Sequence, residues 1–204
     1  MSIFKQKNIK ICLVGDGGVG KTTFVTKHRK DYFEQKYIPT MGVEVQPVRV
    51  NTNYGDFFLN LWDTAGQEKY GGLQEGYYCG AQAFIVFFDV TSTLSYNNTY
   101  KWIDKIISIE PDALIVLVGT KNDCKSRKVK LSQIFPYKNI QYYDISSKTK
   151  FNYENPFLYI LNKLLQKDDI NFVDSIPKVK VKTIDSRIDH LLYTSNMLEE
   201  YKRK

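Results

Sequence analysis

The strongest constraint on the fold is a glycine-rich segment, GDGGVGKT at residues 15–22, that lies between an apolar run and a polar one. The apolar run, IKICLVG, predicts a strand, and the segment KTTFVTKHRK that follows the glycines has helical character. The segment fits the pattern G-x-x-x-x-G-K followed by Ser or Thr. Its glycines let backbone N–H groups approach phosphate oxygens, and the N-terminus of the next helix adds partial positive charge. The sequence therefore predicts a loop that binds the phosphates of a nucleoside triphosphate.

The residues of this loop have distinct expected roles. Lys21 is predicted to reach the outer phosphates and to take part in their chemistry. The hydroxyl of Thr22 is predicted to ligate Mg²⁺. The expected nucleotide contacts of the segment are Asp16, Gly17, Gly18, Val19, Gly20, Lys21, Thr22 and Thr23.

Short apolar segments alternate with longer polar or amphipathic ones as far as residue 167. The later expected strands are GVEVQPVRV, DFFLNLWD, AFIVFFDVT, ALIVLVG and IQYYDIS, and the expected helices include TYKWIDKIIS and NPFLYILNKLLQ. Pro47 indicates an edge or a bulge, and NTNYGD predicts a hairpin turn. Near-continuous apolar strands are typical of a parallel sheet covered on both faces. We therefore predict an α/β domain over residues 1–167, with a six-stranded, mostly parallel sheet and helices on both faces.

Residues 168–204 form a second predicted region. Its first half is polar and without a clear period, which predicts a flexible linker. Apolar residues at near-helical spacing then predict an amphipathic helix. These residues are Ile184, Ile188, Leu191, Leu192, Leu198 and Tyr201.

Composition narrows the class of protein. No apolar run approaches the roughly 20 residues of a membrane helix, and the first residues lack the pattern of a secretory signal, so a soluble intracellular protein is expected. The three cysteines have no spacing typical of a metal site. Net charge is +7, with basic clusters KHRK and KSRKVK, and a solvated basic face is favoured over direct nucleic-acid binding.

A second motif, WDTAGQEKY, begins at the end of the strand DFFLNLWD. Asp63 is predicted to hold Mg²⁺ through a water, and Gly66 to offer its N–H to a terminal phosphate. Gln67 is predicted to orient the attacking water. Thr40, in YIPTMGVEV, is predicted to place its hydroxyl on Mg²⁺ and its N–H on the γ-phosphate, so that hydrolysis releases the loop.

The stretch LVGTKND at residues 117–123 is either a strand that ends in a polar turn or the place where a nucleotide base is bound. With the other motifs it resembles the small GTPases, from about residue 8 to residue 167. The resemblance implies that Asp123 hydrogen-bonds guanine and that Lys121 lays its stem along the base. DISSK, at residues 144–148, resembles the family's Ser-Ala-Lys element, with Ser147 in place of Ala. The implied base contacts are Thr120, Lys121, Asp123, Ser146, Ser147 and Lys148.

Thr120 departs from this resemblance, because the family usually has Asn at this position. The usual Asn touches both the base and the phosphate loop, and the Thr hydroxyl is shorter. Some members of the related Rho branch also carry Thr here, so guanine binding is still expected. Weaker retention of the nucleotide is a hypothesis.

Several segments resemble the Ran branch, the nuclear-transport GTPases. They are FEQKYIPTMGVEVQPV, WDTAGQEKYGGLQEGYY, RKVK, and IQYYDISSK followed by PFL. The resemblance implies that Phe33 packs near guanine and that Tyr37 lies over the phosphates beside Gln67. It also implies a monomer in nucleus and cytoplasm without a lipid anchor. Its partners would be importin-β-type receptors, an exchange factor and a GTPase-activating protein.

The tail departs from Ran, because it has as many basic as acidic residues and ends in YKRK, where Ran has a strongly acidic tail. The alternative is a Rab-like or otherwise diverged GTPase of trafficking or signalling. Rab shares WDTAGQE but not KYGGLQEGYY or GVEVQPV.

Overall fold

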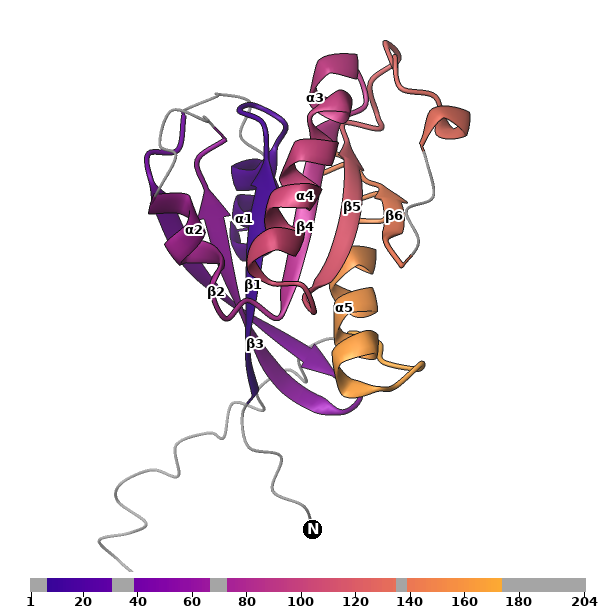
Figure 1. Ribbon diagram of the computed structural model, residues 1–204. Helices are drawn as coiled ribbons and strands as arrows, with labels where there is room; N and C mark the ends of the chain where they lie inside the picture. Colours follow the sequence, from indigo (N-terminus) through magenta and orange to yellow (C-terminus); the bar gives the residue numbers. More distant parts are fainter. Residues whose placement is uncertain (1–6, 31–38, 67–72, 135–138, 174–204) are drawn as a thin grey trace, which may run out of the picture. The chain divides into compact units, whose positions relative to one another are not determined.

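The computed structural model describes residues 7–30, 39–66, 73–134 and 139–173 (Figure 1). The predicted tail helix and most of the predicted linker, residues 174–204, lie outside the described residues. In the part of the chain that is described, no helix is long and apolar enough to cross a membrane.

A six-stranded sheet forms the centre of the molecule. Its strands are β1 (Lys7–Gly15), β2 (Val43–Thr52), β3 (Gly55–Thr64), β4 (Ala83–Asp89), β5 (Leu114–Thr120) and β6 (Gln141–Asp144). Their spatial order is β2-β3-β1-β4-β5-β6. Only β2 runs antiparallel to its neighbour, and Pro47 lies on this edge strand, where its missing N–H costs no ladder hydrogen bond. The predicted six-stranded, mostly parallel sheet is confirmed.

The side chains of β1 explain why the sheet is covered on both faces. Ile9, Ile11 and Leu13 point to one face, and Cys12 and Val14 to the other, because alternate residues of a strand face opposite ways. All five are buried, and all seven residues of β4 are buried as well. Each fully buried aliphatic or aromatic side chain stabilises the fold by about 1.5–3 kcal/mol.

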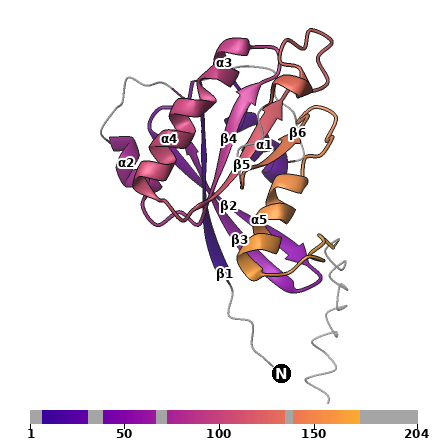
Figure 2. The ribbon, with the colours of Figure 1, turned by 45° about the vertical axis from the view of Figure 1, so that its right-hand side comes forward.

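Helices cover the two faces. On the face of Ile9 lie α1 (Lys21–Lys30) and α5 (Asn155–Leu165), which contribute Phe24, Val25, Phe157, Ile160 and Leu161 to the core. On the other face lie α2 (Leu73–Tyr78), α3 (Thr93–Asn97) and α4 (Thr99–Ile109), which contribute Tyr78, Tyr96, Trp102, Ile103 and Ile106. Figure 2 shows α4 and α5 on opposite sides of the sheet. The prediction of helices on both faces is confirmed.

The strand order also determines where a ligand binds. From β1 the chain goes to β2 and β3 on one side, and β4 then pairs with β1 on the other side. In sheets of this kind, ligands bind beyond the carboxyl ends of the strands where the order reverses. The loop after β1 lies at this point.

The tip of the β2–β3 hairpin contacts the segment after α5. Thr52 bridges to Phe172, and the Val173 N–H donates to the Asn51 carbonyl at 3.0 Å. Tyr54 donates its hydroxyl to the Asp169 carboxylate, and Ile170 is buried. The start of the predicted linker is therefore held against the hairpin as far as Val173, and the division into two domains stays a prediction.

His28 of α1 is packed among aromatic rings. Its ring stacks on Tyr153 with 3.7 Å between centroids and meets Phe157 edge-on at 4.7 Å. Nδ1 lies 3.0 Å from the Phe24 carbonyl oxygen, to which a neutral imidazole donates from this nitrogen. Nε2 is buried without a partner among the described residues. Burial lowers the pKa of His28 from 6.5 to about 3, against the opposing effect of the Phe24 hydrogen bond.

His28 makes the stability of the protein depend on pH. The unfolded chain takes up a proton at this residue below pH 6.5, and the folded chain does not, so the free energy of unfolding decreases as pH falls from 6.5 toward 3. Urea unfolding of the protein and of His28→Phe at about pH 7 and about pH 5 measures this effect. We expect the variant to lose less stability on acidification, because it has no imidazole to protonate. Equal losses in both proteins would contradict this assignment.

Candidate functional site

The loop between β1 and α1 is held close to the sheet. Gly15 ends β1 with φ +136°, and a Cβ at this position would lie 2.3 Å from the Phe87 carbonyl oxygen of β4. Only glycine fits there, because an L side chain both collides with β4 and disfavours this conformation. Residues 16–20 then turn into α1, which begins at Lys21. The predicted strand–loop–helix arrangement is present, with backbone N–H groups at the N-terminus of a helix.

Lys21 is buried beneath this loop. Its Nζ donates to the carbonyl oxygens of Gly15 at 2.8 Å and Asp16 at 2.9 Å. Burial lowers the pKa of Lys21 to about 8, and the carboxylates of Asp63 and Asp16 oppose this shift. These bonds fix the ammonium within the phosphate loop, and no carboxylate of the described residues bonds to it directly. An anion that enters the loop therefore gains a strong partner.

Three residues from separate segments converge beside the loop. The hydroxyl of Thr22, in the first turn of α1, donates to Asp63 Oδ2 at 2.6 Å. The hydroxyls of Thr22 and Thr40 are 2.9 Å apart. Asp63 is brought here by the parallel pairing of β3 with β1, and Thr40 by the segment before β2, where the Ala65 N–H donates to the Gly42 carbonyl at 2.9 Å. The structure thus brings together all three residues predicted to hold a metal ion.

The chemistry of this cluster fits Mg²⁺. Asp63 Oδ1 is buried and has no hydrogen-bond partner among the described residues. Burial raises the pKa of Asp63, which the Thr22 hydrogen bond and Lys21 oppose, while Glu44 adds to the increase. A buried carboxylate with a free oxygen is stabilised by a cation, and Mg²⁺ prefers oxygen ligands such as carboxylates and hydroxyls. Bound Mg²⁺ would neutralise charge on the phosphates, and Thr22, Thr40 and Asp63 would hold it.

Gly66 lies directly against the phosphate loop. A Cβ on Gly66 would be 2.4 Å from the Gly17 nitrogen and 2.5 Å from the Asp16 carbonyl carbon, so no larger residue fits in this arrangement. The segment after β3 therefore approaches the loop where the terminal phosphate is expected. Gln67, Phe33 and Tyr37, which were predicted to act on the water, base and phosphates, lie outside the described residues.

Thr120 ends β5 below the phosphate loop and is buried. Its hydroxyl lies 2.6 Å from the Val19 carbonyl oxygen and 3.0 Å from the Phe88 carbonyl oxygen. The shorter side chain therefore reaches the phosphate loop. A hydroxyl has one proton, and both acceptors are backbone carbonyls, so no donor remains for the base.

Lys121 crosses the space between the two loops. Its Nζ donates to the Gly18 carbonyl oxygen at 3.1 Å and to Asp89 Oδ2 at 2.6 Å. That its stem lies along the base stays a prediction. Asp89, at the end of β4, was not identified from the sequence. Burial raises its pKa, but hydrogen bonds from Lys121 and Thr91 outweigh burial, so the pKa of Asp89 is lowered and it stays a charged partner of Lys121.

Asp123 and Ser146 join the two loops that were predicted to bind the base. The buried Ser146 hydroxyl donates to Asp123 Oδ1 at 2.6 Å, and the Asn122 N–H donates to the Ile145 carbonyl at 3.1 Å. The Asp123 side chain is exposed in the protein alone. A base bound over it would bury it. Ser147 and Lys148 follow on the same turn, half-buried and exposed respectively.

Asp16 has partners that the sequence analysis missed. Asn98 Nδ2 donates to Asp16 Oδ2 at 2.8 Å, and Trp102 Nε1 donates to Asp16 Oδ1 at 2.9 Å. A carboxylate in a phosphate-binding loop repels the ligand unless it is turned away, and these two uncharged donors hold it against the N-terminal end of α4. A spacing of four residues puts Asn98 and Trp102 on the same side of a helix. This spacing is the feature of the sequence from which the two donors could have been predicted.

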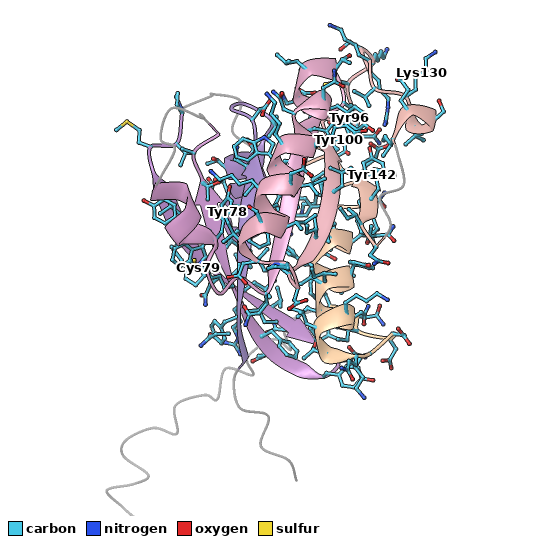
Figure 3. All side chains as sticks on the ribbon, in the orientation of Figure 1. Tyr78, Cys79, Tyr96, Tyr100, Lys130 and Tyr142 are labelled. Carbon is cyan, nitrogen blue, oxygen red and sulfur yellow. The ribbon has the colours of Figure 1, made fainter. Side chains whose placement is uncertain are left out.

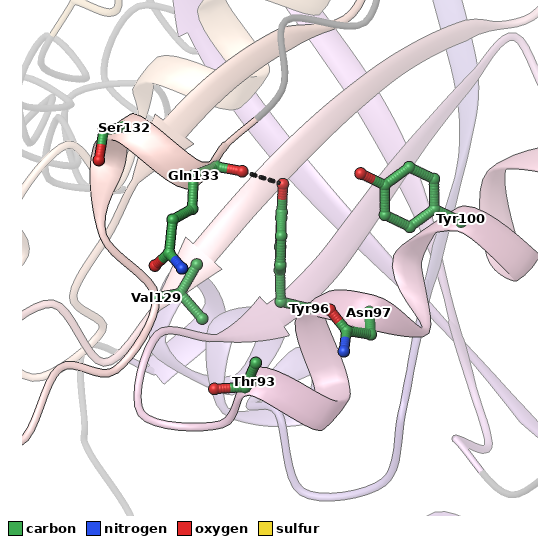
Figure 4. A pocket seen from close by; sticks show the side chains of 7 residues that line it. All are labelled: Thr93, Tyr96, Asn97, Tyr100, Val129, Ser132 and Gln133. Carbon is green, nitrogen blue, oxygen red and sulfur yellow. Dashed lines mark hydrogen bonds between the residues drawn. The ribbon is translucent and has the colours of Figure 1, made fainter.

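A hollow of about 390 Å³ lies away from these residues, beside α3 and the start of α4 (Figure 4). The Tyr96 hydroxyl closes one side by donating to the Gln133 carbonyl oxygen at 2.8 Å. Its lining residues are Thr93, Tyr96, Asn97, Tyr100, Val129, Ser132 and Gln133. None of them belongs to the predicted nucleotide or metal site.

These features are typical of a P-loop nucleotide-binding protein, and the three residues predicted to bind a metal come from segments next to the phosphate loop. A family model described as the Ras family matches residues 10–166, which is more than half of the chain. The chain belongs to the Ras family. It is therefore a GTPase that binds GTP and GDP with Mg²⁺, hydrolyses GTP to GDP and acts as a molecular switch. Small GTPases generally interact with exchange factors and GTPase-activating proteins.

Thr120 offers a direct test of nucleotide retention. Thr120→Asn adds a longer side chain with two N–H donors, so we expect GDP to dissociate more slowly, by up to about tenfold. Thr120→Val keeps the shape but removes the hydroxyl from the Val19 and Phe88 carbonyls, so we expect faster dissociation. Displacement of a fluorescent GDP analogue by excess GDP gives the three rates. An unchanged rate in Thr120→Asn would refute the hypothesis that Thr120 weakens retention.

Proposed function

We propose that this GTPase is a Ran-type switch of nucleocytoplasmic transport, which binds importin-β-type receptors in its GTP state and moves between nucleus and cytoplasm. The observation that carries the proposal is the position of the two most Ran-like segments. GVEVQPV, at residues 42–48, follows Thr40 closely, and KYGGLQEGYY, at residues 69–78, begins three residues after Gly66. Both segments therefore adjoin a residue predicted to sense the γ-phosphate, as a partner surface that depends on the nucleotide requires.

The surface next to Thr40 suits a protein partner. Met41 and Val45 are exposed apolar residues, with 83% and 45% of their surface accessible. Val45 lies on β2, the edge strand of the sheet, and Glu44 and Pro47 of this strand are exposed as well. Contacts on such a surface would change when Thr40 leaves the metal site. This supports a partner that distinguishes GTP from GDP.

Charge also supports a transport receptor. Net charge is +7, and an acidic receptor is attracted to a basic surface at long range. The balanced charge of the tail differs from Ran, so the proposal assigns no role to an acidic tail.

A Rab-like or otherwise diverged GTPase of trafficking or signalling is the second candidate, because WDTAGQE is shared with Rab. Such a protein acts in trafficking or signalling without binding transport receptors, and the Rab type acts on membranes. Cell fractionation that places the protein on membranes would favour this candidate.

The test is capture by an immobilised importin-β-type receptor of protein loaded with GDP, a non-hydrolysable GTP analogue or an ATP analogue. We expect capture of the GTP-analogue form alone. We also expect Met41→Ser to weaken capture by about tenfold, as loss of an apolar contact at an interface centre does. The matched control is Leu94→Ser, which removes a 70% exposed apolar residue from α3, outside both Ran-like segments.

Two results would contradict the Ran-type role. The first is no capture in any nucleotide state with loading confirmed, and the second is equal capture of the GDP and GTP-analogue forms. Either result would leave a Ras-family GTPase without the transport assignment.

A further inference from the structure

The cluster KSRKVK had suggested a solvated basic face, but Arg127 of this cluster does not belong to one. Its side chain is 23% exposed and donates in three directions. Nε donates to the Val129 carbonyl at 2.6 Å, and Nη1 donates to Asp144 Oδ2 at 2.7 Å and to Asn122 Oδ1 at 3.2 Å. A guanidinium can make several such contacts at the same time, because its N–H donors point in different directions within one rigid plane.

The acceptors of Arg127 lie on both loops that flank the base. Asn122 directly precedes Asp123, and Asp144 lies two residues before Ser146. The Ser146–Asp123 hydrogen bond of 2.6 Å is therefore flanked by a second connection, in which Arg127 joins the same two segments. The positions of Asp123 and Ser146 relative to each other depend on both.

Asp144 is a well-fixed anchor for Arg127. Its other oxygen accepts from the hydroxyl of Tyr142, which lies on β6 beside β5 (Figure 3). Gly119 of β5 makes room for this contact, since a Cβ there would be 2.4 Å from the Tyr142 hydroxyl oxygen. Burial, together with the Asp144 hydrogen bond, raises the pKa of Tyr142, so the phenol stays protonated and able to donate. Both oxygens of Asp144 are thus occupied by donors, and the carboxylate is 12% exposed.

We propose that Arg127 is a positioning residue for guanine specificity, which holds the Asp123 carboxylate in place by joining Asn122 to Asp144. Arg127 acts through other residues and does not itself touch the base. The exocyclic 2-amino group distinguishes guanine from hypoxanthine, and this group is what a carboxylate such as Asp123 binds. A site built to hydrogen-bond a group rejects the analogue that lacks it, so the selectivity for GDP over inosine diphosphate measures the placement of Asp123.

The experiment measures dissociation constants for GDP and for inosine diphosphate, in Mg²⁺, for the full chain, three single variants and one double variant. Arg127→Met keeps a long side chain but removes every donor, and Arg127→Lys keeps the charge without the diverging donors. The matched control is Arg49→Met, which breaks the ion pair of Arg49 with Asp56 on the β2–β3 hairpin. Thermal unfolding of each variant shows whether it is folded.

We expect the selectivity for GDP over inosine diphosphate to fall about tenfold in Arg127→Met. This is the size of effect that the loss of a hydrogen bond to a charged group produces. We expect a smaller fall in Arg127→Lys and none in Arg49→Met. Asp144→Asn combined with Arg127→Met should add little to Arg127→Met alone, because both changes break one connection.

The proposal is overturned if both affinities fall by the same factor in Arg127→Met, because a general loss of structure lowers them together. It is also overturned if neither affinity changes. If Arg127→Met does not fold, the selectivity of Arg127→Lys decides: a selectivity equal to that of the unmodified protein overturns the proposal. The proposal does not rest on the transport role, so a failure of receptor capture has no bearing on these ratios.

Discussion

The parallel pairing of β1 with β3 is the constraint on which the rest of the site depends. It sets Leu13 opposite Asp63, and the Thr64 hydroxyl reinforces it by donating to the Leu13 carbonyl at 2.8 Å. Because of this register, the phosphate loop after β1 and the Asp63 carboxylate at the end of β3, which we predict binds the metal, lie at the same edge of the sheet. Thr22 can then reach Asp63, and Gly66 can approach the loop. A slip by one residue would turn Asp63 to the other face.

The charged side chains of the site have hydrogen-bond partners of different kinds. Among the described residues, Asp16 of the phosphate loop accepts hydrogen bonds from the uncharged donors Asn98 and Trp102, whereas Asp89 is paired with Lys121. Lys21 is directed at backbone carbonyls and stays available to an anion. Asp63 keeps one buried oxygen without a partner among the described residues. Positive charge is therefore available to the phosphates and negative charge to the metal.

Most of the fold and the phosphate end of the site were predictable, because they depend on short patterns. Alternating apolar segments identified the sheet, and GDGGVGKT and WDTAGQ identified Lys21, Thr22, Asp63 and Gly66. The supporting residues were not predictable, since they depend on which elements meet in space. Nothing in KSRKVK distinguishes the half-buried Arg127 from its exposed basic neighbours Lys125, Lys128 and Lys130. The reach of Thr120 depends on how close β5 lies to the phosphate loop.

We propose that Thr40 connects the metal site to the γ-phosphate and so makes the protein a switch. The most direct measurement is the Mg²⁺ dependence of affinity for a GTP analogue and for GDP, in the protein and in Thr40→Ala. We expect Mg²⁺ to tighten GTP-analogue binding less in Thr40→Ala than in the unmodified protein, because one metal ligand is missing. For GDP, the effect of Mg²⁺ should be the same in both. Equal Mg²⁺ dependence for the GTP analogue in both proteins would contradict it.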